Sequence, residues 1–452
     1  MNVTVVGTGY VGTVTGACLA YLGHDVICVD LDEAKINKLK RGVISIYEPG
    51  LAELIKLSAN NLTFTTDLKS AVVEGDVIII AVGTPALPSG ESDTQYIKAA
   101  AISIGEAMDK AKHRVVVTKS TVPIGCGVWV DRWLFEGAPW DASFSVASNP
   151  EFLREGSAVH DSLFPDRIVL GANDEATMAI LRGLYEDLVN QEFDCPEFLD
   201  HSDNWFDNVP VPVFETTVTS AETIKYAANS FLAMKIGFAN EMANICEKVG
   251  ADVEDVMRGM GSDSRIGPKF LRPGLGWGGS CFGKDVHSLI HTATMSGYEP
   301  LLLNASVDVN RRQRDRMMEK LRDKVDIHLN STIAILGLAF KPDTDDLRDA
   351  PALEIIRRLL KCGAIINVYD PIAMPVCYRD EPELNIRYCG TALEAVTGAD
   401  AVLLITEWKE FVDLDLKKVA ELTARPILID GRNCISPEAA RDAGLDYTGF
   451  GR

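Results

Sequence analysis

Residues 6–12 read VGTGYVG and place Gly7, Gly9 and Gly12 in the spacing G-x-G-x-x-G. An apolar run at 2–6 precedes this turn, and a helical pattern at 11–22 follows it. A strand, a glycine turn and a helix in this order predict a dinucleotide-binding unit. The alternative for a glycine turn taken alone is a purely structural role, so the residues around it carry the argument.

Each position of the turn has a predicted task. Gly7 permits the tight bend, Gly9 lets the backbone approach a pyrophosphate, and Gly12 lets the helix pack on the sheet. Tyr10 and Val11 open the helix, whose N-terminus attracts phosphate charge. These five residues are the first predicted cofactor contacts.

Asp30 ends the second predicted strand. An acid there accepts hydrogen bonds from the adenosine ribose and repels a 2′-phosphate, which favours NAD over NADP. Lys35 is a predicted neighbour of that ribose, with a solvated side chain as the alternative. Thr84 in GTP and Thr121 in STVP follow later strands, where a doubly wound sheet binds its ligand; each stretch could also be a turn fixed by proline.

The composition limits the classes of function. The chain has 452 residues, which suggests two to three domains, and a net charge of −21 without a long basic run. Broad binding to nucleic acid or to an anionic membrane is therefore disfavoured. No apolar run reaches the roughly 18–20 residues of a membrane span, and no segment resembles a signal peptide. The 10 cysteines form no C-x-x-C pair, which favours a reducing cytoplasm.

The apolar segments predict an α/β protein with two Rossmann-like doubly wound parallel-sheet domains joined by a long central helix. The predicted strands are 2–6, 25–29, 76–82 and 114–118 in the first run and 332–336, 365–369, 401–405 and 427–429 in the second. Residues 220–250 have helical periodicity and predict the central helix. We expect an NAD-binding domain at 1–215, a central helical domain at 216–325 and a second Rossmann-like domain at 326–452. The acidic segment 194–212 shows no period and predicts a surface loop.

The stretch GWGGSCFGKD at 276–285 raises the question of what Cys281 does. It could be a core thiol, a metal ligand, half of a disulfide or a nucleophile. The scattered cysteines disfavour a disulfide, and no ligand set for a metal is apparent; His287 and His291 have zinc-like spacing but lack acid partners. Gly278 and Lys284 so close to the thiol fit a core position poorly.

Eight collinear motifs resemble those of the nucleotide-sugar 6-dehydrogenases, the UDP-glucose/GDP-mannose dehydrogenase family. They are VGTGYVG at 6–12, GTP at 83–85, STVP at 120–123, NPEFLREG at 149–156, AETIKYAANSFLAMKI at 221–236, SRIG at 264–267, FLRPGLGWGGSCFGKD at 270–285 and GLAFKPDTDDLRDAP at 337–351. The family oxidises the C6 alcohol of a nucleotide-bound hexose to a carboxylate with two NAD⁺ per sugar. The resemblance implies UDP-glucose as substrate, with dTDP-glucose, GDP-mannose or a UDP-N-acetylhexosamine as alternatives. A non-catalytic nucleotide-sugar binding protein is a further alternative.

The resemblance also implies a dimerisation and catalytic role for domain 216–325 and UDP-sugar binding for domain 326–452. It implies a catalytic set as well. Cys281 would be the nucleophile that forms a thiohemiacetal and then a thioester. Lys225 would stabilise an oxyanion or act as base, and Asn229 and Asp285 would hold a water or move a proton. Glu151 would be the acid and base of thioester hydrolysis. The alternative for a lysine and an asparagine four apart on a helix is a solvent-facing position.

The remaining roles are implied by the same motifs. Thr121 would orient a water or touch the cofactor, and Glu155, Lys284 and Arg348 would lie on the cofactor side. Glu151 and Glu155, four apart, would repel each other on a helix and could instead mark a wet face. The implied substrate contacts are Glu151, Phe152, Leu153, Glu155, Lys225, Asn229, Arg265, Phe270, Leu271, Arg272, Gly274, Gly278, Lys341 and Arg432. Arg265 would reach a neighbouring subunit's site, which implies a homodimer or a higher even oligomer; no metal is expected.

Overall fold

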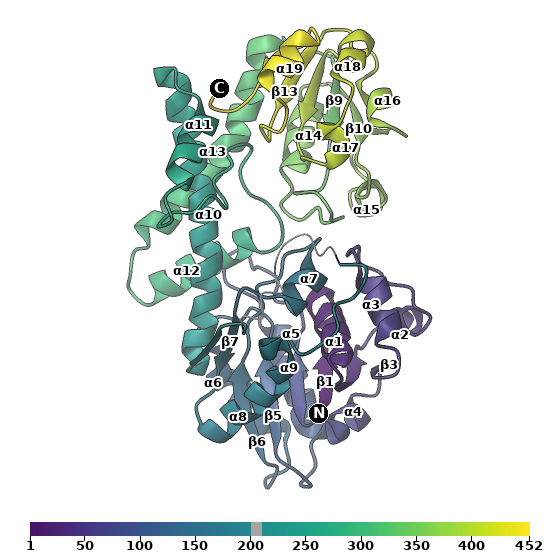
Figure 1. Ribbon diagram of the computed structural model, residues 1–452, viewed down its shortest axis with the longest axis vertical. Coiled ribbons are helices and arrows are strands. Elements are labelled where there is room, and N and C mark those ends of the chain that lie inside the picture. Colours follow the sequence, from purple (N-terminus) through teal and green to yellow (C-terminus); the bar gives the residue numbers. More distant parts are fainter. Residues whose placement is uncertain (200–209) are drawn as a thin grey trace. The chain divides into compact units, whose positions relative to one another are not determined.

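The computed structural model describes residues 1–199 and 210–452, which form two compact units, Met1–Ala227 and Ala228–Arg452 (Figure 1). Of the predicted surface loop at 194–212, residues 200–209 lie outside the described residues, and the described ends contain no helix or strand. The division into three domains at 215 and 325 stays a prediction.

The first unit is built on an eight-stranded sheet in the order β3-β2-β1-β4-β5-β6-β7-β8. Its strands are β1 (Asn2–Val6), β2 (Asp25–Val29), β3 (Leu62–Thr65), β4 (Val77–Ile80), β5 (Arg114–Thr118), β6 (Phe144–Ser148), β7 (Ile168–Gly171) and β8 (Val213–Thr216). The predicted parallel-sheet fold is confirmed. One pair, β6 with β7, is antiparallel, which the apolar pattern did not predict because strand composition does not report direction.

Both faces of this sheet are covered, as the doubly wound fold requires. Alternate residues of β4 point to opposite faces, so Ile79 belongs to a core with α1, whereas Ile78 and Ile80 belong to a core with α5 and α6. This two-sided burial explains why β4 reads as a continuous apolar run. The helices are α1 (Tyr10–Tyr21), α2 (Glu33–Lys40), α3 (Leu51–Leu57), α4 (Leu68–Glu74), α5 (Gln95–Ala107), α6 (Cys126–Gly137), α7 (Ala158–Leu163), α8 (Glu175–Leu184) and α9 (Glu186–Asn190).

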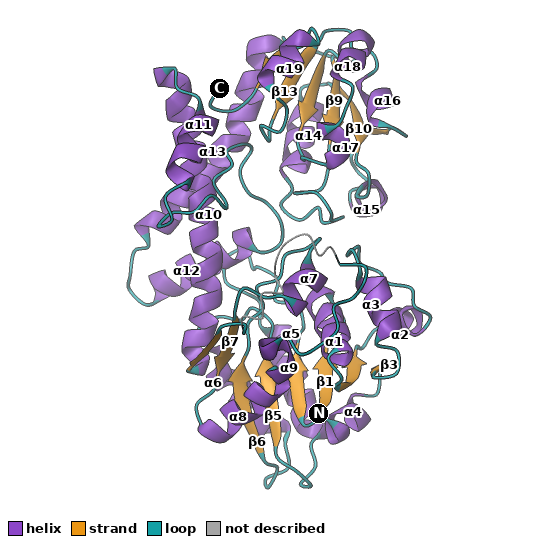
Figure 2. Ribbon diagram, viewed as in Figure 1, coloured by secondary structure: helices purple, strands orange, loops and turns teal. Residues whose placement is uncertain are grey.

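The second unit contains a six-stranded parallel sheet in the order β11-β10-β9-β12-β13-β14 (Figure 2). Its strands are β9 (Thr332–Leu336), β10 (Ile365–Tyr369), β11 (Arg387–Tyr388), β12 (Ala401–Leu404), β13 (Ile427–Asp430) and β14 (Asp446–Thr448). Its helices after α10 (Val218–Val249) are α11 (Val253–Gly261), α12 (Phe282–Met295), α13 (Leu301–Lys324), α14 (Pro351–Lys361), α15 (Met374–Asp380), α16 (Ala392–Val396), α17 (Lys409–Val412), α18 (Leu416–Leu422) and α19 (Pro437–Asp442).

The predicted central helix is α10 (Val218–Val249), a continuous helix of 32 residues. It passes through the boundary at Ala227, so the chain runs from one unit to the other as helix. Gly250 follows it with φ +76°, a left-handed conformation typical of a helix end. The prediction of a long joining helix is therefore confirmed.

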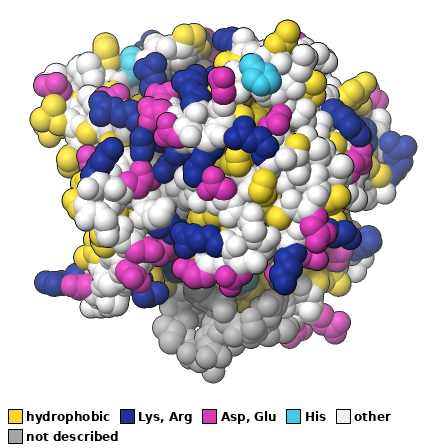
Figure 3. All heavy atoms as spheres, turned by 90° about the horizontal axis from the view of Figure 1, so that it is seen from above, with side chains coloured by type: hydrophobic (Ala, Val, Ile, Leu, Met, Phe, Trp, Pro, Cys, Tyr) yellow, Lys and Arg dark blue, Asp and Glu magenta, His cyan; other side chains and the backbone are white. Residues whose placement is uncertain are grey.

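The surface drawn in Figure 3 mixes Lys and Arg side chains with Asp and Glu. This mixture agrees with a sequence that contains no long basic run. Within residues 1–199 and 210–452, no helix combines the length and the apolar character needed to cross a membrane.

Candidate active site

The turn between β1 and α1 shows which glycines the fold itself needs. Gly7 has φ +101°, and a Cβ there would lie 2.7 Å from the carbonyl oxygen of Ala81. A Cβ on Gly12 would overlap the carbonyl oxygen of Gly7. A Cβ on Gly9 would meet no heavy atom within 4 Å. Close contacts within the protein thus explain why positions 7 and 12 are glycines. The open space beside Gly9 fits the close approach of a pyrophosphate.

The first turn of α1 has the features of a phosphate site. Gly9 is its N-cap and provides no side-chain cap, so backbone N–H groups at the start of the helix lack a side-chain acceptor there. The hydroxyl of Tyr10 hydrogen-bonds to Glu48, whose carboxylate also accepts from the N–H groups of Gly156 and Ala158, each at 2.7 Å. The Tyr10 side chain is therefore used for internal packing, and its predicted cofactor contact would come from the backbone.

Asp30 lies beside this turn. Its Oδ2 accepts from the N–H of Thr8 at 2.9 Å, from the Thr8 hydroxyl at 2.7 Å and from Lys35 Nζ at 3.0 Å. Burial raises the pKa of Asp30, but these bonds and one from the N–H of Asp32 outweigh it and lower the pKa to about 2. Asp30 is therefore ionised at neutral pH, as an acceptor for ribose hydroxyls must be. Lys35 is paired with Asp30, which argues against a freely solvated side chain.

The loops after β4 and β5 are joined to each other. The hydroxyl of Thr84 donates to the carbonyl oxygen of Thr121 at 2.8 Å. The hydroxyl of Ser120 donates to the carbonyl oxygen of Val82 at 2.7 Å. These bonds hold the two predicted cofactor loops together at the carboxyl ends of neighbouring parallel strands.

Lys225 and Glu151 form a buried ion pair in the first unit. Lys225 Nζ lies 2.9 Å from Glu151 Oε1 and donates to the Glu151 carbonyl oxygen at 2.6 Å. Only 4% of the lysine side chain and 9% of the glutamate side chain are exposed. Residues 151–154 are not helical, so the wet helix face considered for Glu151 and Glu155 does not form. The ammonium also lies 5.4 Å from the centre of the Phe152 ring.

The N–H of Leu153 donates to Glu151 Oε2 at 2.8 Å, so the second carboxylate oxygen is held by the segment's own backbone. The predicted residues Glu151, Phe152, Leu153 and Lys225 thus gather at one place. The solvent-facing alternative for Lys225 is excluded.

Sequence reasoning missed Lys119 in this cluster. It precedes STVP, is 9% exposed, and its Nζ donates to Asn149 Oδ1 at 2.8 Å. Tyr185 donates to the same oxygen at 2.5 Å. Burial lowers the pKa of Lys119 to about 8, with Glu151 raising it and Lys225 lowering it. A lysine at the end of an apolar strand gave no local signal, because its burial depends on residues distant in the sequence.

Cys281 lies in the second unit as the N-cap residue of α12, and it is exposed. The core-thiol alternative is therefore wrong. A thiol at the start of a helix lies where the helix dipole favours the thiolate. Ser280 Oγ lies 3.5 Å from Cys281 Sγ.

Asp285 is buried one turn into α12 and accepts from two predicted catalytic residues. Asn229 Nδ2 donates to its Oδ2 at 2.6 Å, and Lys284 Nζ donates to its Oδ1 at 2.6 Å. Asp285 is 1% exposed and Asn229 is 8% exposed. The residues predicted around the thiol therefore form a connected polar network in which Lys284 is paired with Asp285.

Backbone atoms leave no room for a side chain at Gly274 and Gly278. A Cβ on Gly278 would overlap the carbonyl oxygen of Asp349, and one on Gly274 would overlap that of Gly431. The crowding by Asp349 is enough to require glycine at 278, so the close approach of a nucleotide stays a prediction. Phe270 has φ +65°, an uncommon conformation for a bulky residue, and its ring lies 6.3 Å from that of Phe282.

Arg432 links the loop at 276 to the turn after β9. Its guanidinium donates to the carbonyl oxygens of Ile405 at 2.7 Å, Gly276 at 3.2 Å and Phe340 at 2.9 Å. Lys341 Nζ lies 5.6 Å from the centre of the Phe340 ring. These contacts bring Arg432, Lys341 and the 270–278 segment into one region of the second unit, as predicted.

The other predicted arginines are more exposed. Arg348 pairs with Asp346 at 2.8 Å, and Arg265 pairs with Asp263 at 2.5 Å; their side chains are 66% and 86% exposed. Arg272 is also exposed, whereas its neighbour Leu271 is buried. The exposed arginines are accessible to a phosphate or to another subunit.

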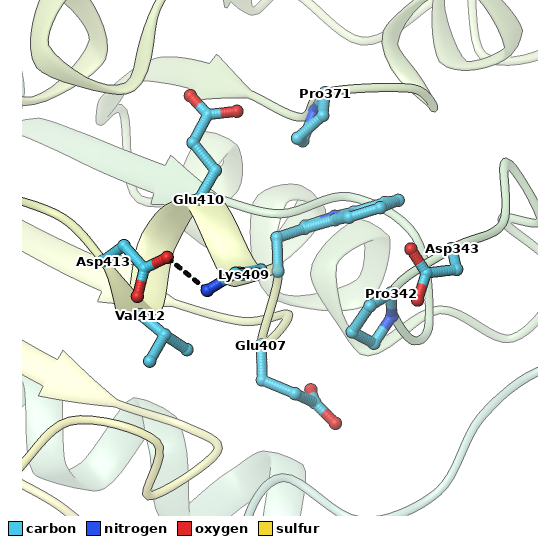
Figure 4. Close-up of a pocket in the computed structure, with 9 residues that line it drawn as sticks. Pro342, Asp343, Pro371, Glu407, Lys409, Glu410, Val412 and Asp413 are labelled. Carbon is cyan, nitrogen blue, oxygen red and sulfur yellow. Dashed lines mark hydrogen bonds and ion pairs between the residues drawn. The ribbon is translucent and has the colours of Figure 1, made fainter. Parts of the chain in front are cut away.

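A hollow lies at the carboxyl ends of β9, β10 and β12 (Figure 4). Its lining residues are Pro342, Asp343, Pro371, Glu407, Trp408, Lys409, Glu410, Val412 and Asp413. The lysine is paired with Asp413 at 2.7 Å, which leaves the lining rich in carboxylates. Glu407 of this lining is also paired with Arg432 at 3.2 Å, so the hollow adjoins the predicted substrate residue Arg432.

Known proteins resemble this chain over the segments that contain these residues. Sequence models of the UDP-glucose/GDP-mannose dehydrogenase family match the chain three times: its NAD binding domain at residues 1–189, its central domain at 219–312 and its UDP binding domain at 334–437. The chain belongs to this family. The predicted family and the predicted cofactor, NAD, are confirmed, and the open space at Gly9 and the ionised Asp30 fit that cofactor.

Individual members of the family match along their whole length. UDP-glucose 6-dehydrogenase TuaD of Bacillus subtilis (strain 168) is 45% identical over 100% of this chain and 93% of its own. UDP-glucose 6-dehydrogenase of Rhizobium meliloti (strain 1021) is 43% identical over 100% of both chains. The solved UDP-glucose dehydrogenase of Pyrobaculum islandicum is 36% identical with a TM-score of 0.88, covering 99% of this chain and 96% of that one.

Among residues 1–199 and 210–452, no cluster of three or more His, Cys, Asp and Glu side chains is placed to hold a metal ion.

Proposed function

We propose that this chain is an NAD-dependent UDP-glucose 6-dehydrogenase that makes UDP-glucuronate by a four-electron oxidation through Cys281. The observation that carries the proposal is the exposed thiol of Cys281 at the start of α12, beside the buried network of Asn229, Asp285 and Lys284. Relatives named UDP-glucose 6-dehydrogenase support the choice of sugar. A double oxidation needs such a nucleophile, because the aldehyde must become a tetrahedral adduct before a second hydride can leave.

Several residues of the first unit would hold the cofactor. The turn of Gly7, Gly9 and Gly12 and the first amides of α1 would bind the pyrophosphate, and Asp30 would bind the ribose. Thr84, Thr121 and Glu155 would lie toward the nicotinamide, and Lys284 and Arg348 would complete the cofactor contacts. Bound NAD⁺ supplies the hydride acceptor in each of the two oxidations.

In the first oxidation the C6 hydroxyl loses its proton and the carbon loses a hydride, which leaves an aldehyde. Lys225 would stabilise the developing oxyanion, or accept the proton when its ammonium is neutral. Asn229 and Asp285 would hold a water that carries the proton away.

In the second oxidation the Cys281 thiolate would bond to the aldehyde carbon, giving a thiohemiacetal. Loss of the second hydride from C6 and of the proton from the adduct's hydroxyl turns this adduct into a thioester. Glu151 would then take a proton from water as the water attacks the thioester and return a proton to the leaving thiolate. Water supplies the carboxylate oxygen, and Cys281 is regenerated.

The residues proposed to hold the nucleotide sugar are Phe152, Leu153, Phe270, Leu271, Arg272, Gly274, Gly278, Lys341 and Arg432. Arg265 is proposed to reach the site of a second copy, which requires a homodimer or a higher even oligomer with α10 as the interface. A reducing cytoplasm is the proposed location, because it preserves a reactive thiol.

The test is the amount of NADH formed per sugar in the wild type and in Cys281→Ser. With limiting UDP-glucose, the wild type should release about two NADH per sugar, because each oxidation transfers one hydride. Cys281→Ser should lose net turnover to UDP-glucuronate by about 1,000-fold or more, because serine is the weaker nucleophile. Cys362→Ser, an exposed cysteine of the same unit, is the matched control and should retain the wild-type stoichiometry.

The substrate is tested with a panel of UDP-glucose, dTDP-glucose, GDP-mannose and a UDP-N-acetylhexosamine. Faster turnover of another sugar than of UDP-glucose would overturn the choice of sugar. NADH yield and rate unchanged in Cys281→Ser would overturn the nucleophile. Binding of NAD and sugar with no NADH formed by the wild type would favour a non-catalytic binding protein.

A further inference from the structure

Glu222 is a buried acid that none of the roles above uses. It lies on α10, three residues before Lys225, and only 3% of the residue is exposed. Its two carboxylate oxygens accept from two backbone N–H groups, Oε2 from Gly125 at 2.6 Å and Oε1 from Gly127 at 2.8 Å. A buried carboxylate is costly unless it is satisfied, and here both oxygens are bonded to one target, the start of α6.

The start of α6 depends on this carboxylate. Its N-cap residue, Gly125, has φ +89° and provides no side-chain cap. Glu222 therefore supplies from another helix what a capping side chain would supply locally, and its negative charge lies at the positive end of the α6 dipole. A Cβ on Gly127 would overlap Val218 of α10, so the two helices are in close contact at this point.

The segment that Glu222 holds contains Thr121. Residues 120–125 connect β5 to α6, and their first end is fixed by the Thr84 hydroxyl on the Thr121 carbonyl. Glu222 fixes the second end. Lys225 lies three residues further along the same helix and holds Glu151. The first turns of α10 thus bind both the start of α6, through Glu222, and the segment at Glu151, through Lys225.

We propose that Glu222 is the positioning residue that fixes segment 120–127 to α10 and so sets where Thr121 lies relative to Lys225. The inference rests on the proposed function for its effect on catalysis. The fixing of the segment is a property of the fold and can be measured separately.

We expect the fixing of segment 120–127 to depend on whether Glu222 is ionised. Burial raises the pKa of Glu222 to about 7, although the two amide bonds lower it. Cys126 on α6 is a titratable group near it, and burial, followed by Glu222, raises the pKa of Cys126 to about 12. On its own helix, Lys225 follows three residues later and is paired with Glu151. The strand β7, which also packs on α10 at Gly171, contributes no titratable group. Above about pH 7 the carboxylate accepts both N–H groups, and as the pH falls below 7 protonation weakens one bond.

The experiment is the pH profile of kcat for the wild type, Glu222→Gln and Glu136→Gln, an exposed glutamate of α6 as the control. Glu222→Gln should reduce kcat about tenfold at pH 8 while KM for NAD changes less than about twofold, since about 1.4 kcal/mol corresponds to a factor of ten. The decline of the wild-type kcat below pH 7 should be reduced in Glu222→Gln and retained in Glu136→Gln.

Hydrogen exchange measures the fixing without any turnover. Amides of segment 120–127 should exchange at least tenfold faster in Glu222→Gln than in the wild type, with the amides of β1 and β4 unchanged. Unchanged exchange in this segment, or a kcat loss explained by a smaller folded fraction with an unchanged pH profile, would overturn the proposal. If the wild type oxidises no nucleotide sugar, the proposed function fails, and the exchange result alone still decides whether Glu222 fixes the segment.

Discussion

The two Rossmann-like units share one layout and use it differently. In the first unit β1 has β2 and β4 as neighbours, and in the second β9 has β10 and β12. Gly7 and Gly337, which follow the first strand of each sheet, have φ +101° and +97°. The difference begins two residues later. Gly9 has open space beside it, whereas Ala339 is 0% exposed and accepts a hydrogen bond from Thr406.

The acid that follows the second strand of each sheet is also more open in the first unit than in the second. Asp30 keeps 19% of its side chain exposed and accepts from Thr8 and Lys35. Asp370 is 0% exposed, and its partners are the N–H groups of Leu338, Ala339, Ile372 and Ala373 and the indole N–H of Trp408. The protein itself occupies the hydrogen-bonding capacity that a ribose would use. One layout therefore provides a dinucleotide turn in the first unit and a closed structural turn in the second.

The largest expected effect is on stability, from Asp370→Ala. This substitution leaves four backbone N–H groups and an indole N–H without their acceptor, so the free energy of unfolding should fall by about 3–5 kcal/mol. Urea denaturation followed by circular dichroism measures the loss. Asp30→Ala, at the corresponding position of the first unit, should cost about 1 kcal/mol, because that acid is partly exposed. Equal losses for the two variants would remove the distinction between the two acids.

The next effect is on cofactor affinity, from Gly9→Val. Gly9 has φ −68°, which valine can adopt, so stability should change by less than about 0.5 kcal/mol. The side chain would occupy the space that a pyrophosphate needs, so Kd for NAD should rise about 10- to 100-fold, or about 1.4–2.8 kcal/mol. Fluorescence titration with NAD measures this.

Ala339→Gly serves as the matched control in the second unit and should leave Kd for NAD unchanged. An unchanged Kd in Gly9→Val would mean that the space beside Gly9 is not where the pyrophosphate binds.

The smallest effect is on cofactor choice, from Asp30→Asn. Removing the charge that repels a 2′-phosphate should reduce the preference for NAD over NADP about tenfold, as judged by the ratio of the two kcat/KM values. The control Asp32→Asn, a capping acid of α2, should keep the wild-type ratio.

The pH dependence follows from the sign of the Asp30 shift. Its pKa is lowered from 3.8 to about 2, so its contribution to stability is present above about pH 4 and is lost as the pH falls toward 2. The wild-type preference for NAD should therefore be constant from pH 7 to 9, where Asp30 is ionised and the 2′-phosphate of NADP, with a second pKa of about 6, keeps its full charge. A preference that titrates in this range would contradict the assignment of Asp30.

Several residues of the candidate site could be proposed from the sequence because their signals are local. The glycine turn, the acid after the second strand and the four-residue spacing of Lys225 and Asn229 are each contained in a short stretch. The contact of Lys225 with Glu151, which are 74 positions apart, depends on the tertiary fold and was not predicted. Lys119 and Glu222 gave no local signal at all, since a charged residue beside an apolar segment is ordinarily exposed.

The sequence by itself determined the parallel-sheet class, the place of the NAD turn and the family, because the pattern of apolar residues and glycines reports backbone geometry directly. Only the tertiary structure decided that Asp30 is ionised and accessible while Asp370 is fully bonded. It also decided that Cys281 is exposed at the start of a helix and that Glu222 caps α6. These properties depend on burial and on hydrogen bonds between distant segments, which exist only after the chain has folded.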